Sequence, residues 1–128
     1  MAPVTTLYAS LIALLFLGLS MRVVAYRRAK QVSLGDAGDP ALTASIRAQG
    51  NCAEYAPIGL LLLLLAELQS APPVALHVLG LMLLAGRTLH ASALSQHPQP
   101  LASRVGGMIL TFTMIGLAAL GLLLHRLF

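Results

Sequence analysis

Charged side chains are scarce in this sequence. Only 9% of its 128 residues are Asp, Glu, Lys or Arg, whereas 58% are hydrophobic and the mean hydropathy is +0.85. A soluble domain averages about 25% charged residues, so these few charges cannot cover a surface that faces water. The composition therefore excludes an ordinary soluble domain and indicates a protein of the lipid bilayer.

Cysteine is also scarce, because Cys52 is the only one in the sequence. A single cysteine excludes an internal disulfide and a multi-cysteine metal site. The CxxC, HExxH, P-loop and GxGxxG patterns are missing as well, and no two histidines have a spacing typical of a metal site. We expect no bound metal, with His97 and His125 in a loop and at the terminus. We expect Cys52 to pack as a small hydrophobic side chain, with a nucleophilic role as the alternative.

Four apolar segments approach the length of about 20 residues that one transmembrane helix needs. They cover residues 4–25, 53–68, 72–85 and 105–124, and the second and third reach this length only if their polar ends are helical too. The first segment lacks the basic residues that precede the apolar part of a signal peptide, so we favour a membrane helix over that alternative. The sequence predicts an all-α membrane protein, a four-transmembrane-helix bundle that forms one domain over residues 1–128.

The positions of the basic residues predict how the helices cross the membrane. Seven of the eight Lys and Arg residues lie near the first and third connections, namely Arg22, Arg27, Arg28, Lys30, Arg47, Arg87 and Arg104. The positive-inside rule then places these connections in the cytoplasm and both termini outside it. The pI near 10.0 is compatible with nucleic-acid binding, but charges that gather at membrane edges do not form the basic face which that function needs.

The second helix has a recognisable start, because Asp39 suits an N-cap and Pro40 suits the first helical position. A helix from residue 40 to about residue 70 would be roughly 45 Å long. This exceeds the ~30 Å hydrocarbon core, so we expect its first turns to project into the cytoplasm. We expect Pro57 to kink this helix, and we expect Glu67 to end it in water.

A polar stripe runs along this helix, because Arg47, Asn51, Glu54 and Tyr55 fall within roughly a 100° arc at about 100° per residue. A charge that faces lipid costs at least ~2.5 kcal/mol, so the stripe must face protein or a wet cavity. The alternative is an Arg47–Glu54 ion pair that only holds helices together.

Polar groups of the other helices are expected at the same depth. Arg87 and His90 are three residues apart and therefore share one face of the third helix, while Arg104 begins the fourth. Arg27 and Arg28 end the first helix and can reach this level, although membrane anchoring is the more common role for them and for Lys30. For Arg104, anchoring and a place in the site are equal alternatives. The convergence of these groups predicts a pocket rich in arginine.

An arginine-rich pocket with one carboxylate suits an anionic ligand that also carries an amine. Glutathione fits, because it has two carboxylates, one α-amine and a thiol. Arginine binds carboxylates bidentately, and Glu54 would bind the ammonium group. The surrounding bilayer would supply a hydrophobic second substrate.

The segment RAQGNCAEYAP at residues 47–57 resembles the second-helix signature of the MAPEG family, the membrane-associated proteins in eicosanoid and glutathione metabolism. RRA at 27–29 is similar to the family's basic end of the first helix, and GRTLHA at 86–91 is similar to its third-helix segment. Arg104 stands where the family places its thiol-activating arginine. The resemblance covers essentially the whole chain, and the short loops resemble those of a bacterial inner-membrane member.

The resemblance implies a homotrimer that binds glutathione between subunits near the cytoplasmic face. It implies that Arg104 holds the thiolate and that the glutathione contacts are Arg27, Arg47, Asn51, Glu54, Tyr55, Arg87 and His90. A free thiol has a pKa of about 8.5, which a nearby cation or helix N-terminus lowers. The implied function is a membrane-bound glutathione transferase or peroxidase that acts on a lipophilic small molecule. The alternative is a non-catalytic lipid-binding or scaffold protein like the family's lipoxygenase-activating member.

Two positions depart from the family pattern. His90 and Leu94 stand where eukaryotic members carry tyrosines. These departures weaken a specific eicosanoid assignment and leave a general glutathione transferase open.

Overall fold

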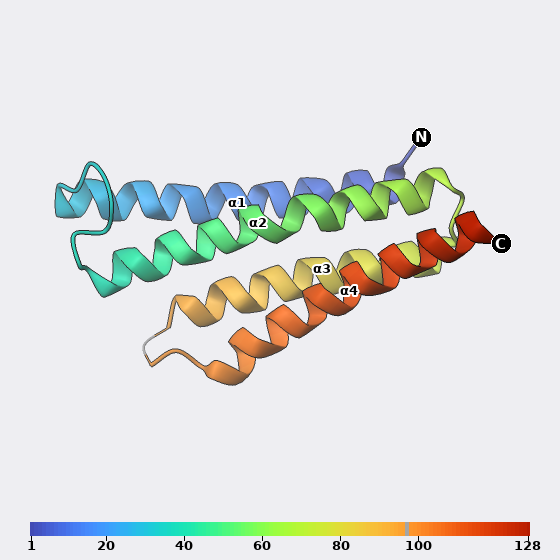
Figure 1. Ribbon diagram of the computed structural model, residues 1–128. Coiled ribbons are helices and arrows are strands. Elements are labelled where there is room, and N and C mark those ends of the chain that lie inside the picture. The colour runs from blue at the N-terminus through green and yellow to red at the C-terminus, as the bar shows by residue number, and fades with distance from the viewer. Residues whose placement is uncertain (97) are drawn as a thin grey trace.

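The computed structural model describes residues 1–96 and 98–128, and His97, which we expect in a loop, lies outside them. It contains four helices: α1 (Pro3–Lys30), α2 (Pro40–Leu68), α3 (Pro73–Leu94) and α4 (Leu101–Leu127). All four are long and apolar enough to cross a membrane, so the predicted four-helix membrane fold is confirmed. Figure 1 shows both termini at one end of the bundle and the α1–α2 and α3–α4 connections at the other.

The start of α2 follows the sequence prediction. The helix begins at Pro40, and the Asp39 carboxylate accepts a hydrogen bond of 2.8 Å from the Leu42 N–H. The same carboxylate forms an ion pair of 2.7 Å with Lys30. These two contacts, the Lys30 bond above all, hold the pKa of the Asp39 carboxyl below its usual range. The cap therefore also ties the start of α2 to the end of α1.

The prediction that Glu67 ends α2 in water is wrong. Its half-buried carboxylate lies at the start of α1, where it accepts hydrogen bonds of 2.9 Å from the Val4 N–H and 2.7 Å from the Thr5 N–H. The first N–H groups of a helix have no partner within the helix, and a helix N-terminus favours negative charge. Because the N-cap residue of α1 offers no capping side chain, Glu67 supplies that cap from another helix.

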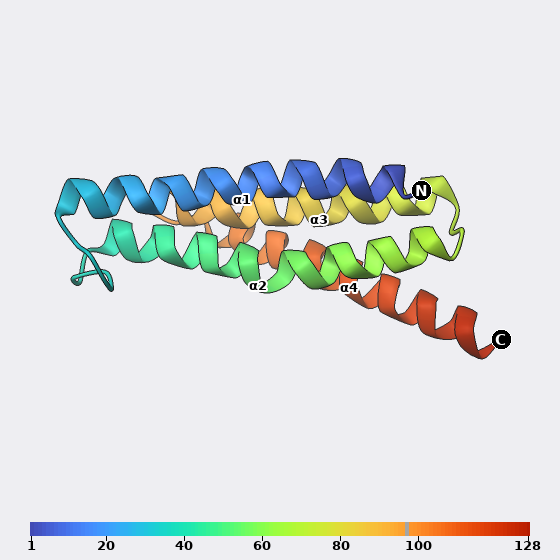
Figure 2. The same cartoon turned by 90° about the horizontal axis from the view of Figure 1, so that it is seen from above.

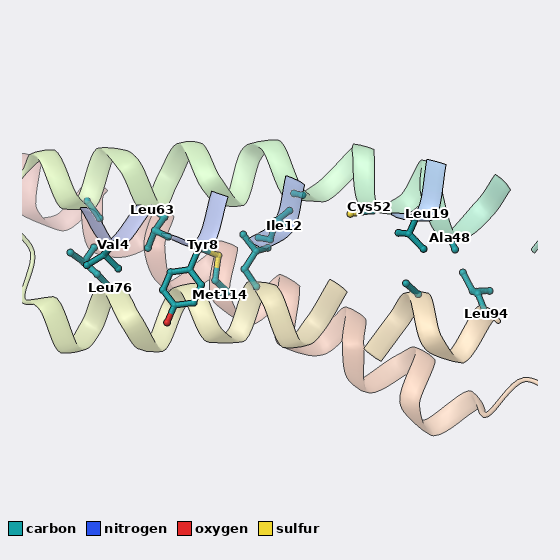
Figure 3. Packing of buried hydrophobic residues seen from close by; sticks show 14 residues of the cluster. Val4, Tyr8, Ile12, Leu19, Ala48, Cys52, Leu63, Leu76, Leu94 and Met114 are labelled. Atoms are coloured by element: carbon teal, nitrogen blue, oxygen red, sulfur yellow. The ribbon is translucent and has the colours of Figure 1, made fainter. Parts of the chain in front are cut away.

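The core lies where α1, α2 and α3 meet, with one contribution from α4. Figure 3 shows its members distributed along the inside of the bundle, among them Val4, Tyr8, Ile12, Leu19, Ala48, Cys52, Leu63, Leu76, Leu94 and Met114. Cys52 is buried in this cluster, as predicted for a small hydrophobic side chain. α4 packs on α2 and α3, and among the described residues it makes no contact with α1. Figure 2 shows α4 diverging from α1 toward the C-terminus.

α3 and α4 approach each other closely where two glycines face each other. A Cβ atom on Gly107 would lie 2.6 Å from the carbonyl oxygen of Gly86 and 2.7 Å from the backbone nitrogen of His90. A Cβ atom on Gly86 would lie 2.8 Å from the carbonyl oxygen of Gly107. The two backbones are therefore in direct contact, as small residues permit at membrane helix interfaces. This contact fixes the depth at which the polar residues of α3 meet those of α4.

Candidate functional site

A cleft of about 890 Å³ opens between the first half of α2, the end of α3 and the start of α4. It lies toward the end of the bundle that carries the α1–α2 and α3–α4 connections. The residues that line it are Gly38, Pro40, Thr43, Ala44, Arg47, Asn51, His90, Leu94, Gln99, Leu101, Arg104, Val105, Met108, Ile109 and Phe112. Three different helices therefore bring four of the predicted site residues, Arg47, Asn51, His90 and Arg104, to one cavity.

Two guanidinium groups stand at this cleft, from Arg47 on α2 and Arg104 on α4, and both side chains are exposed. The guanidinium of Arg104 has no hydrogen-bond or ion-pair partner among the described residues. Its backbone is held instead, because His90 Nδ1 lies 3.2 Å from the Arg104 carbonyl oxygen. His90 is buried against the start of α4. The geometry leaves the Arg104 cation free to bind an anion in the cleft.

Arg87 lies behind the cleft wall rather than in it, with only 1% of the residue exposed. Its Nε donates to the Thr111 hydroxyl at 3.0 Å, and its Nη1 donates to the side-chain oxygen of Asn51 and, at 3.4 Å, to the Asn51 carbonyl oxygen. Nη2 contacts the Met108 sulfur at 3.2 Å. The guanidinium carbon also lies 5.3 Å from the centroid of the Tyr55 ring, a cation–π contact.

The charge of Arg87 has no carboxylate partner among the described residues. A buried charge needs compensation from hydrogen bonds or an opposite charge. Here an amide oxygen, a hydroxyl, a thioether and an aromatic face provide it. These hydrogen bonds also connect three helices, because Arg87 on α3 binds Asn51 on α2 and Thr111 on α4.

The polar stripe predicted on α2 is divided by the fold. Asn51 is buried against Arg87, and Arg47 lines the cleft. Glu54 does not line the cleft, and its carboxylate lies 4.0 Å from Arg47 Nη1, with 54% of the Glu54 side chain and 61% of the Arg47 side chain exposed. Arg27 is also outside the cleft, in a shallow depression at the end of α1. The ligand contacts expected of all eight site residues, those at the cleft included, stay predictions.

Sequence reasoning missed the contributions of α4 beyond Arg104. Met108 and Thr111 follow Arg104 at positions i+4 and i+7, a spacing that places all three on one helix face, so this signal was present in the sequence. Phe112 packs against Tyr55 with the ring centroids 5.4 Å apart. Together with the exposed Val105 and Ile109, Phe112 gives the cleft an apolar wall on its α4 side.

Comparison with known proteins finds one matching family and two similar membrane proteins. Residues 5–124 match the MAPEG family. The chain is 42% identical over 87 residues to the inner membrane protein YecN of Escherichia coli K12 and, equally, to the protein of the same name in Escherichia coli O6:H1. The matched region covers 68% of this chain and 66% of each relative, just under two thirds of their length.

Proposed function

The chain belongs to the MAPEG family, and from this membership and the geometry of the cleft we propose that it is a membrane-bound glutathione transferase. Its four transmembrane helices make it an integral membrane protein, and its relatives are proteins of the bacterial inner membrane. The observation that carries the proposal is the pair of exposed guanidinium groups, Arg47 and Arg104, at one cleft that also has an apolar wall on its α4 side. This combination suits a ligand with several negative charges beside a hydrophobic second substrate.

In the proposed mechanism Arg47 and Arg104 have separate tasks. Arg47 binds a glutathione carboxylate, because guanidinium and carboxylate match in shape and charge. Arg104, a permanent cation in the second turn of α4, stabilises the thiolate and lowers the pKa of the bound thiol. The thiol proton passes to water. The sulfur then forms a bond to an electrophilic carbon of the lipophile, and the leaving group departs with its electron pair.

A peroxidase reaction would use the same glutathione thiolate with a hydroperoxide in place of the electrophilic carbon. The thiolate would attack the outer oxygen of a lipid hydroperoxide and break the O–O bond, giving an alcohol and a sulfenic acid of glutathione. A second glutathione would then reduce the sulfenic acid, forming glutathione disulfide and water. Both variants use the thiolate that Arg104 stabilises.

We assign Arg87 and His90 to the support of this site. Arg87 holds the Asn51 amide and lies against the Tyr55 ring, so it fixes two side chains that the α2 motif contributes. His90 contacts the backbone of Arg104 and so positions the start of α4. In this proposal Arg87 acts on glutathione through Asn51 and does not contact it.

The proposed assembly is a homotrimer with glutathione at the contact between subunits. Glu54 and Arg47 are largely exposed on a helix whose other exposed side chains are mostly apolar, and their mutual distance of 4.0 Å gives only a loose ion pair. Charges that face lipid cost at least ~2.5 kcal/mol each. A second copy that covers this surface would remove that cost, and it could bring Arg27 of one subunit toward the cleft of its neighbour.

A non-catalytic lipid-binding protein is the second candidate. The apolar wall of Val105, Ile109 and Phe112 supports it, since this wall suits a lipophilic ligand whether or not glutathione reacts there. The transferase requires glutathione to bind and to be consumed. The lipid-binding protein requires neither.

Calorimetric titration of detergent-purified protein with glutathione separates the two candidates. We expect saturable binding in the unchanged protein and binding weaker by about 10- to 100-fold in Arg47→Ala, because a charge-assisted contact contributes ~1.5–3 kcal/mol. Arg126→Ala removes an exposed cation at the opposite end and serves as the matched control. Conjugation to a lipophilic aryl halide then tests turnover. Absence of any glutathione binding would leave only the lipid-binding candidate.

A further inference from the structure

Three cations lie at the end of α1, and among the described residues one of them, Lys30, forms an ion pair there. Lys30 forms its ion pair of 2.7 Å with Asp39. The other carboxylate of the α1–α2 connection, Asp36, accepts hydrogen bonds from the Gly38 N–H at 3.0 Å and the Thr43 hydroxyl at 2.7 Å. Both acidic groups near this helix end are therefore engaged.

Arg27 and Arg28 are the two cations for which the structure describes no direct ion pair, although Arg27 is near enough to Asp36 to attract its carboxylate electrostatically. Neither has an ion-pair partner in the part of the chain that the structure describes. Nη1 of Arg27 is buried, and it has no hydrogen-bond acceptor among residues 1–96 and 98–128. A buried donor without an acceptor costs free energy, so an anion or other acceptor at this point would stabilise the protein.

The two arginines border a shallow depression of about 360 Å³. Its remaining lining comes from Val24, Gln31, Val32 and Ser33, so polar and apolar groups meet in it. The depression shares no lining residue with the cleft between α2 and α4. It is thus a separate candidate site at the end of α1.

An apolar stripe on the outer face of α1 leads directly to this depression. Leu14, Leu17, Met21 and Val24 are all exposed, and their spacing of three and four residues places them on one side of the helix. We call these four residues the α1 stripe. Arg28 is the next residue in the same spacing, four positions after Val24. In a bilayer the stripe contacts acyl chains, and Arg28 stands at the level where those chains join their headgroups.

We propose that the end of α1 binds an anionic phospholipid of the adjacent leaflet, with its phosphate at Arg27 and Arg28 and an acyl chain along the α1 stripe. Charge selects the headgroup, because juxtamembrane basic residues attract anionic lipids and guanidinium groups bind phosphate through charge-assisted hydrogen bonds. The stripe selects a lipid over free phosphate, which has no chain to lie on it. The depression is separate from the cleft within one subunit, and Arg28 and the α1 stripe have no part in the proposed glutathione chemistry.

Native mass spectrometry of the purified protein in mixed micelles tests this site, with dioleoyl phosphatidylglycerol and dioleoyl phosphatidylcholine offered in equal amounts. We expect the unchanged protein to retain phosphatidylglycerol preferentially. The Arg27→Gln/Arg28→Gln variant should lose that preference by roughly fivefold for each arginine removed. Lys30→Gln removes a cation that is already paired and should keep the preference, which makes it the matched control.

Several outcomes would overturn the proposal. Equal retention of the two lipids by the unchanged protein would show that the site does not distinguish an anionic headgroup from a zwitterionic one. If Lys30→Gln loses the preference for phosphatidylglycerol to the same extent, the preference depends only on the net charge of the protein. If inorganic phosphate alone displaces the lipid, the site binds anions and does not recognise the acyl chain. Circular dichroism checks that each variant is folded. If the double variant is not folded, Arg28→Gln carries the test, because its side chain is exposed and its loss should still give roughly a fivefold effect.

Discussion

Arg87 shows how a single residue can organise a polar site inside an apolar bundle. Its three guanidinium nitrogens reach Thr111 on α4, Asn51 on α2 and the Met108 sulfur, while its guanidinium carbon lies over the Tyr55 ring. A lysine could supply the charge but not this fork of donors. The residue therefore connects the α2 motif with α4, and the cleft depends on it without being lined by it.

Arg87→Lys tests this structural role. We expect the melting temperature in detergent to fall, with a loss of about 1–3 kcal/mol, because the change leaves buried acceptors without donors. Glutathione binding should weaken as well, since Asn51 loses its support. Arg28→Lys, at an exposed position, is the control. A variant that keeps its stability while losing glutathione binding would instead indicate that Arg87 contacts the ligand directly.

Some of these residues could be predicted from sequence and others could not, for a physical reason. Helical periodicity places Asn51 near Arg47 and Arg87 near His90. Arg104 is at the start of α4, so the sequence places it at the same depth in the membrane as these residues. Periodicity within one helix cannot tell which face of that helix meets a neighbour. The sequence therefore predicts one surface for Glu54 and Asn51, although the packing of α3 against α2 buries Asn51 and leaves Glu54 exposed.

The helices are held in register by contacts that involve backbone atoms. Glu67 caps the first turn of α1, Asp39 caps α2, and Gly86 and Gly107 bring the backbones of α3 and α4 together. The Asp39 cap follows from its place before a proline. The Glu67 cap and the glycine contact join residues of different helices, so no local pattern predicts them.

Gly107→Ala tests the contact between α3 and α4. The added methyl group would lie 2.6 Å from the Gly86 carbonyl oxygen, and because that neighbour is backbone, the helices must separate. We expect a loss of about 1–3 kcal/mol, typical of overpacking, together with impaired glutathione binding.

The adjacent Gly106→Ala is the matched control, because a Cβ atom there meets nothing within 4 Å. Thermal unfolding in detergent measures the melting temperatures of both variants, and we expect that of Gly107→Ala to be lower. Equal melting temperatures would show that the Gly86–Gly107 contact does not hold the helices together.

Across the whole molecule, four spans place both termini at the same end, and the cleft lies toward the opposite end, where the α1–α2 and α3–α4 connections are. The number of spans was predictable from hydropathy, because each helix is apolar over most of its length. The side of the membrane that each end faces rests on the charge distribution. Arg87 does not contribute to that distribution, because it is buried between helices.

The orientation can be measured with a reporter fused after Phe128. Because most of the basic residues surround the two connections near the cleft, we expect the reporter to lie outside the cytoplasm. Fusion within the connection between α1 and α2 should give the opposite signal. A cytoplasmic signal from the fusion after Phe128 would place the cleft on the outer side, away from cytoplasmic glutathione.

The central claim is that the cleft binds glutathione and lowers the pKa of its thiol through Arg104. Ultraviolet absorbance of the thiolate, recorded against pH on mixing glutathione with the protein, measures this directly. We predict a thiolate signal below the usual thiol pKa of about 8.5, and we predict that Arg104→Ala still binds glutathione but shifts the signal back toward that value. Absence of a thiolate signal with saturated protein, or an unchanged signal in Arg104→Ala, would contradict the account.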